Sequence, residues 1–205
     1  KLPETAYTVL ATSTVEEDAE LAGYTYAPQV VFHQGHPDDV LQRYLDVTEK
    51  LGIDVVIRVT ADMPYVSKEI TEHLLKAHFE SGADYTAAEN CAVGTAPEII
   101  NVQALQKVKE HFPSADYSEY MTWYFQNNRE FFNVKIVELP EDYIRYYRLT
   151  LDYQEDLELF NALQTYLDKS SEAGNLFQIY NFLDNNPEVA NLNNHISLKY
   201  KTDQK

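Results

Sequence analysis

The sequence contains a single cysteine, Cys91, so an internal disulfide is excluded. A chain of 205 residues without disulfides depends on its hydrophobic core, and 44% hydrophobic residues are enough to build one. Free cysteine is typical of reducing compartments, and we therefore expect a cytoplasmic protein. No apolar run approaches the ~20 residues that cross a bilayer, and residues 1–5 lack the apolar region of a signal peptide.

Positive charge is scarce as well. Lysine and arginine number 16 against 33 aspartates and glutamates, which gives a formal net charge of −17. Nucleic acids and anionic membranes are bound by clustered cations, so we expect neither as a partner. A small anionic ligand would need local basic groups or a divalent metal. The spacings of zinc sites and of phosphate-binding P-loops are also missing.

The first eighty residues alternate apolar, strand-like runs with amphipathic helical segments. Strands are expected at 7–11, 29–32, 53–60, 83–90, 97–102 and 131–139, and helices after 13, 37 and 67 and at 104–111, 118–127, 152–167 and 176–185. This alternation predicts a single α/β domain with a mainly parallel sheet and helices on both faces. Ligands of such sheets bind beyond the carboxyl ends of the strands.

Two aspartates occupy matching places in this pattern. Asp62 follows the third strand, and Asp152 follows a short strand that ends at Leu151; Thr60 and Thr150 precede them. Two carboxylates at one sheet edge suit Mg²⁺, which takes one or two carboxylates and fills its octahedron with water and substrate phosphates. Each residue also has a structural explanation, because Asp152 could cap the following helix and Asp62 could be a turn residue.

Several blocks carry a resemblance to a known family. They are "TVLATSTVEEDAELA", "GHPDDVLQRYLDV", "GIDVVIRVTADMP", "SGADYTAAEN" and "YRLTLDYQEDLEL". In this order they resemble the cytidylyltransferase family typified by spore coat polysaccharide biosynthesis protein F, which is similar to the CMP-sialic acid and CMP-Kdo synthetases. The resemblance implies a Rossmann-like nucleotide-diphospho-sugar transferase fold. It also implies an Mg²⁺-dependent reaction that joins CTP to an acidic sugar and releases pyrophosphate.

The resemblance further implies roles for individual residues. Asp62 and Asp152 match the family's catalytic, metal-binding aspartates. The implied nucleotide-binding residues are Gly35, Asp38, Asp39, Arg43, Thr60 and Ala61, and the implied substrate-binding residues are Glu119 and Thr122. Arg148, in a tyrosine-rich run, is predicted from its neighbours to contact substrate, with interface packing as the alternative. Asp39 and Arg43 could instead form a helical ion pair worth a few tenths of a kcal/mol.

The sequence departs from the family pattern in three places. The block "A-R-x-x-S-x-R-L-P-G-K" is absent, so we expect residues 1–205 to form one domain that lacks its first strand and phosphate-binding loop. Ala61 replaces a glycine. "SEYMTWYF" at 118–125 replaces "R-E-H-V-T-P-Y", and it keeps Glu119 and Thr122. We interpret the polar tail, 196–205, as a lead into a further domain.

These departures leave alternatives to the enzyme open. The first is a non-catalytic nucleotide-sugar-binding or scaffold domain of a larger protein. The second is a glycosyltransferase, which should carry a D-x-D metal pair that this sequence lacks. The apolar run Trp123–Phe125 indicates either a homodimer contact or a buried helix.

Overall fold

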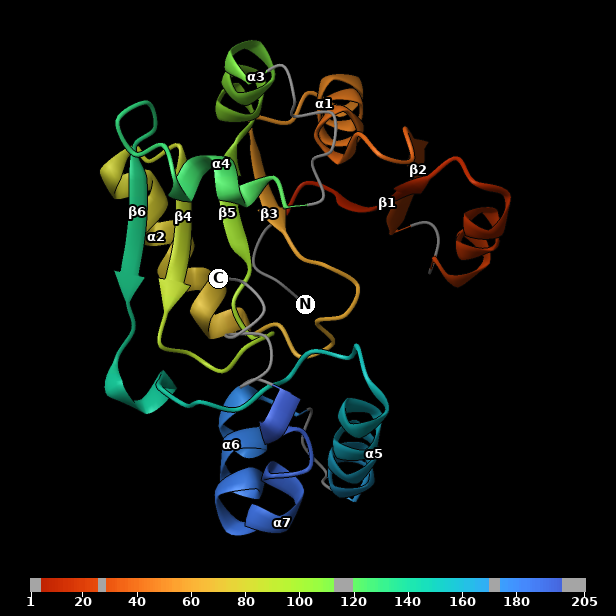
Figure 1. Cartoon of the computed structure of the whole chain (residues 1–205), viewed down its shortest axis with the longest axis vertical. Coiled ribbons are helices and arrows are strands. Elements are labelled where there is room, and N and C mark those ends of the chain that lie inside the picture. Colours follow the sequence, from red (N-terminus) through yellow and green to blue (C-terminus); the bar gives the residue numbers. More distant parts are fainter. Residues whose placement is uncertain (1–4, 26–28, 113–119, 170–173, 197–205) are drawn as a thin grey trace.

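The computed structural model describes residues 5–25, 29–112, 120–169 and 174–196 and shows an α/β fold. Two sheets contain its strands, which are β1 (Thr8–Ser13), β2 (Val30–Gly35), β3 (Val55–Arg58), β4 (Tyr85–Glu89), β5 (Glu98–Asn101) and β6 (Val134–Glu138). β1 and β2 pair in parallel, and the other sheet has the order β3-β5-β4-β6 (Figure 1). β5 is antiparallel to both neighbours, whereas β4 and β6 are parallel. The expected mainly parallel sheet therefore contains one reversed strand.

Most of the helices lie where the sequence predicts them, but the first is a 3₁₀ helix, and the helix expected from residue 152 begins at Gln154. They are η1 (Glu16–Tyr24), α1 (Val40–Leu51), α2 (Lys68–Ser81), α3 (Val102–His111), α4 (Thr122–Gln126), η2 (Glu141–Tyr143), α5 (Gln154–Leu167), α6 (Leu176–Asn185) and α7 (Pro187–Ala190). The side chains of Asp39 and Ser67 accept hydrogen bonds from the first turns of α1 and α2. Gly52 and Gly82 end these helices in the left-handed conformation. None of the described helices is long and apolar enough to cross a membrane.

Neighbouring residues of β5 face opposite sides of the sheet. Ile99 packs into one cluster with α2, α5 and α6, while Ile100 packs into a second cluster with α1, α3 and α4. Both isoleucines are fully buried. Helices thus cover both faces of the four-stranded sheet, as the sequence pattern predicts. Figure 1 shows α5, α6 and α7 gathered below the carboxyl ends of β4 and β6.

One expected strand is absent from the described residues. The segment before Asp152 forms an isolated bridge, Val93 with Arg148, in place of a strand. The Leu149 N–H donates to the Val93 carbonyl over 2.7 Å, and the Val93 N–H donates to the Tyr147 carbonyl over 2.9 Å. The chain before Asp152 is therefore held against the loop between β4 and β5.

This contact depends on Gly94. Its φ is +88°, and a Cβ there would lie 2.2 Å from the Leu149 carbonyl oxygen. We expect Gly94→Ala to lower the free energy of unfolding by at least about 2 kcal/mol, because left-handed strain and a backbone clash add. Urea unfolding measures this loss. Gly23→Ala is the matched control, since a Cβ there meets nothing within 4 Å, and an equal loss in both variants would contradict the prediction.

Candidate active site

The turns that carry Asp62 and Asp152 lie in direct contact. The Leu151 N–H donates to the Asp62 carbonyl over 2.8 Å. Asp62 follows β3 at its carboxyl end, and Asp152 comes two residues before α5. Residues ninety positions apart therefore meet at one edge of the sheet. The structure brings together the two turns that the sequence pattern pairs.

Local structure does not account for either carboxylate. The N-cap of the helix after Asp152 is Tyr153, whose N–H donates to Asp156 Oδ2 in the first turn over 3.0 Å, so Asp152 is not the N-cap. The turn at Asp62 is closed by the backbone, through the Met63 N–H and the Thr60 carbonyl at 3.1 Å. Within the described part of the chain, the Asp62 carboxylate has no hydrogen-bond or ion-pair partner. The N-cap explanation for Asp152 is therefore wrong, whereas Asp62 does lie in a turn, although its carboxylate does not close that turn.

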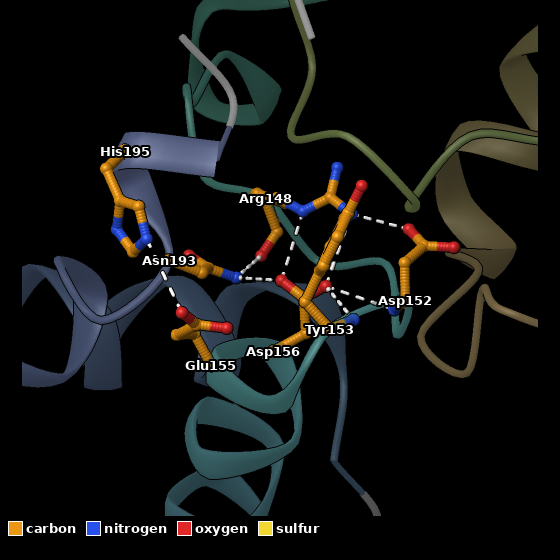
Figure 2. Close-up of polar contacts among 7 residues, drawn as sticks. All are labelled: Arg148, Asp152, Tyr153, Glu155, Asp156, Asn193 and His195. Atoms are coloured by element: carbon orange, nitrogen blue, oxygen red, sulfur yellow. Dashed lines mark hydrogen bonds and ion pairs between the residues drawn. The ribbon is translucent and has the colours of Figure 1, made fainter. Parts of the chain in front are cut away.

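Asp152 is held by a buried network around Arg148, shown in Figure 2. The Arg148 side chain donates from Nε to Asp156 Oδ1 over 3.0 Å and from Nη2 to Asp152 Oδ2 over 2.5 Å. Asn193 joins the network by donating to Asp156 Oδ1 over 2.7 Å and to the Arg148 carbonyl over 3.0 Å. A residue near the end of α7 is thereby tied to the site.

Asp156 is the anionic centre of this network. Burial by itself would raise its pKa, but hydrogen bonds from Arg148, Asn193 and two backbone N–H groups outweigh burial and hold the pKa below its ordinary value of 3.8. The side chain of Arg148 is 6% exposed, and its guanidinium faces two carboxylates. Its predicted contact with substrate stays a prediction. In the structure, Arg148 orients the carboxylate of Asp152.

The acidic pair fits a hard divalent cation. Among the described residues, Asp62 offers an unpartnered carboxylate, and the Asp152 side chain is 36% exposed and binds Arg148 through Oδ2, which leaves Oδ1 outside that bond. No group of three or more His, Cys, Asp and Glu side chains gathers among the described residues, so a closed structural metal site is absent there. Mg²⁺ needs only one or two carboxylates when phosphates complete its shell.

The predicted nucleotide loop is fixed by Arg43. Its guanidinium donates from Nη2 to the carbonyls of His36 and Pro37 over 2.7 and 2.8 Å. A Cβ on Gly35 would lie 2.7 Å from Arg43 Cγ, so the arginine stem packs directly on the glycine. The loop between β2 and α1 is thus pre-formed, and Gly35 allows this close approach.

Asp38 and Asp39 complete this loop with their backbones. His36 Nδ1 accepts from both N–H groups, over 3.2 and 3.0 Å. The Asp39 carboxylate caps α1 and forms an ion pair with Lys109 on α3. The suggested helical ion pair between Asp39 and Arg43 is therefore replaced by a contact between two helices.

The remaining predicted residues are spread around the sheet edge. Thr60 and Ala61 belong to the turn that presents Asp62, and Ala61 is exposed. Thr122 opens α4, one turn before Gln126. Glu119 lies outside the described residues. Of the apolar run in α4, Phe125 is fully buried whereas Trp123 is 55% exposed, so the homodimer contact stays a prediction.

A cavity of about 630 Å³ is lined in part by neighbours of the two aspartates. Its lining includes Met63 and Thr150, from the two aspartate turns, and a polar cluster that sequence reasoning missed: Arg58, Tyr85, Glu98 and Gln126. A usable signal was present in the sequence, since Arg58 and Glu98 are lone charges in short apolar strands. Charges in such positions need a partner.

A family model described as cytidylyltransferase matches residues 1–181. The chain belongs to the cytidylyltransferase family. Spore coat polysaccharide biosynthesis protein SpsF from Bacillus subtilis is 32% identical over 186 residues, which cover 89% of this cytidylyltransferase and 76% of that protein. An uncharacterised protein from Methanocaldococcus jannaschii is 31% identical over 196 residues, covering 93% of this chain and 78% of that one.

Solved structures show the same fold. A cytidylyltransferase from Leptospira borgpetersenii superposes with a TM-score of 0.80 at 22% identity, over 89% of this chain and 77% of that one. A CMP:2-keto-3-deoxy-manno-octonic acid synthetase complexed with CTP gives a TM-score of 0.55 at 13% identity, over 81% of this chain and 83% of that one. The expected Rossmann-like nucleotidyltransferase architecture is confirmed.

Proposed function

We propose that this cytidylyltransferase transfers a cytidylyl group from CTP to an acidic sugar, releasing pyrophosphate, in the biosynthesis of a surface polysaccharide or glycan. The observation that carries the proposal is the contact between the Asp62 and Asp152 turns at the carboxyl end of β3. The name of the relative SpsF supports the polysaccharide context. The likeness to a synthetase described with CTP supports the choice of nucleotide.

In this proposal Asp62 and Asp152 hold Mg²⁺. Held by these two carboxylates, Mg²⁺ would supply positive charge against the phosphates during in-line displacement. Arg148 keeps the Asp152 carboxylate in one orientation through the 2.5 Å bond, so little reorganisation accompanies the reaction. The loop pinned by Arg43 presents its backbone near the nucleotide. The acceptor then occupies the cavity that Met63 and Thr150, from the two aspartate turns, help to line.

A non-catalytic nucleotide-binding domain is the second candidate. The ion pair between Arg148 and Asp152 favours it, because this pair satisfies Asp152 without any metal. The altered block at 118–125 favours it too. The two candidates differ in whether pyrophosphate appears, and not in whether CTP binds.

The test is CTP turnover by the full chain. With MgCl₂ and N-acetylneuraminic acid or 3-deoxy-manno-octulosonic acid as acceptor, we expect pyrophosphate release with CTP at least about tenfold faster than with ATP, GTP or UTP. A coupled phosphate assay measures the release, and EDTA should stop it because two carboxylates alone leave the phosphate charge uncompensated. Calorimetry with CTP and MgCl₂ runs in parallel. Binding without release would favour the second candidate, and neither binding nor release would contradict both.

A further inference from the structure

We infer that the cavity at the carboxyl ends of β3 and β4 binds the uncharged, hydroxyl-bearing part of the acceptor sugar, and that the pairing of Arg58 with Glu98 makes this site indifferent to carboxylate groups. The inference rests on the proposed function, because it assigns the cavity to the acceptor of that reaction. Nothing in the family membership assigns these residues a role.

The position of the cavity places its occupant next to the acidic pair. Met63 directly follows Asp62, and Thr150 comes two residues before Asp152; both line the cavity. The volume of about 630 Å³ lies within the roughly 300–1,000 Å³ that small-molecule sites enclose. An acceptor held here has its reactive hydroxyl beside the carboxylates that would hold the metal and phosphates.

The charge of the lining is balanced. Among the described residues that line the cavity, the charged ones are Arg58 and Glu98, and Arg58 Nη1 lies 2.6 Å from Glu98 Oε2. The side chains are 17% and 19% exposed, so solvent screens this pair only partly. A ligand carboxylate entering the cavity would meet a guanidinium whose positive charge Glu98 already balances through Nη1. The site therefore offers it no net attraction.

The polar groups of the cavity form a chain that suits hydroxyl groups. Gln126 Nε2 donates to the Tyr85 hydroxyl over 2.9 Å, and that hydroxyl donates to Glu98 Oε1. Burial raises the pKa of Tyr85, with the Glu98 charge adding to the effect, so the phenol stays a neutral donor. A hydroxyl both donates and accepts, and it can therefore join such a chain at several points.

Two buried polar atoms of the lining residues have no partner in the described structure. They are Arg58 Nε and Thr150 Oγ1. An unsatisfied buried donor costs about 1–3 kcal/mol, and a bound ligand is one reason for a protein to retain it. The rest of the lining includes the apolar residues Met63, Ala87, Ala88, Ala92 and Ala96. A lining that combines small apolar residues with a few polar groups suits a sugar ring, whose C–H faces are apolar and whose edge carries hydroxyls.

The probes are glucose, mannose and galactose and their uronates, titrated into the full chain without nucleotide and followed by saturation-transfer NMR. We expect at least one hexose to bind, with the matching uronate within about threefold of it, because the lining has no free charge. A uronate that binds more than about tenfold tighter than its hexose would overturn the inference. Absence of binding by all six sugars would overturn it as well.

Two variants test the assignment of residues. Thr150→Val should weaken hexose binding about tenfold without lowering Tm, because it removes a hydroxyl that has no partner in the free protein. Thr165→Val is the matched control on α5, where the hydroxyl donates to the Asn161 carbonyl at the surface. Glu98→Gln should free the Arg58 guanidinium and shift the preference to uronates by at least about tenfold. Unchanged affinity in Thr150→Val, or unchanged preference in a folded Glu98→Gln, would overturn the inference.

These outcomes separate the inference from the proposed function. Sugar binding with the expected variant effects, but without CTP-dependent pyrophosphate release, would remove the proposed function and leave a sugar site. The opposite result is pyrophosphate release in which neither Thr150→Val nor Glu98→Gln changes the acceptor KM or the choice of acceptor. That result would remove the inference and leave the cytidylyltransferase activity.

Discussion

Asp62→Asn should lower the rate of CTP-dependent pyrophosphate release by at least about a hundredfold, the size of effect seen when one electrostatic contact to a transition state is lost. The amide has the same shape as the carboxylate but no charge with which to hold a divalent cation. Because the Asp62 side chain has no partner in the described structure, its free energy of unfolding should stay within about 0.5 kcal/mol of the wild type. Coupled phosphate assays and urea unfolding measure the two quantities.

Asp46→Asn is the matched control for this variant. Asp46 is exposed on α1, where it accepts from Gln42 Nε2 over 2.7 Å, and its replacement should leave the rate unchanged. A full rate in Asp62→Asn would contradict the assignment of Asp62 to the metal. A rate lost together with stability would instead make Asp62 a structural residue, against the geometry of its turn.

Sequence reasoning succeeds where the determinant is local. Asp39 and Ser67 cap α1 and α2, and Gly52 and Gly82 end them, because each needs only its own helix turn. The meeting of Asp62 and Asp152 is predictable for a different reason. Asp62 follows β3, and the segment before Asp152 is held by the loop between β4 and β5, so both turns lie beyond the carboxyl ends of the sheet although the strand expected before Asp152 does not form.

The pairing of the side chains depends on contacts distant in the sequence. Lys109 reaches Asp39 across 70 positions, and Asn193 reaches Asp156 across 37. The identity of the α5 cap illustrates the difficulty. Asp152 has the right residue type and nearly the right place, but Tyr153 takes the N-cap position, and Asp156 in the first turn accepts from the N–H groups of Asp152 and Tyr153. The Asp152 carboxylate is therefore not used by the helix terminus. Local sequence propensity does not predict which of these residues caps α5.

The reversed strand β5 explains why the cavity was missed. Its direction is set by the short connection from β4, and it places Glu98 opposite Arg58 in the antiparallel register. A parallel strand in the same place would present a different partner to Arg58. The polar cluster of the cavity therefore follows from a pairing direction that the apolar pattern of these strands does not encode.

Asp156→Ala should lower the free energy of unfolding by about 3–5 kcal/mol, because it leaves the buried Arg148 guanidinium without its main partner. Asp156 is fully buried and accepts from Arg148, Asn193 and the N–H groups of Asp152 and Tyr153. Urea unfolding at neutral pH measures the loss. Asp168→Ala is the control at the exposed end of α5, where the carboxylate accepts from the Gln164 side chain, and it should cost less than about 0.5 kcal/mol.

The pH dependence of the free energy of unfolding distinguishes the contribution of the Asp156 charge from that of its shape. Since its folded-state pKa lies below the ordinary value of 3.8, the ionised carboxylate contributes its full stability above that value. The contribution declines as the pH falls through the folded-state pKa. The difference in unfolding free energy between the wild type and Asp156→Asn should therefore be largest at neutral pH and shrink in acid. A difference that stays constant down to the folded-state pKa would mean that the shape and packing of Asp156, and not its charge beside Arg148, provide the stability.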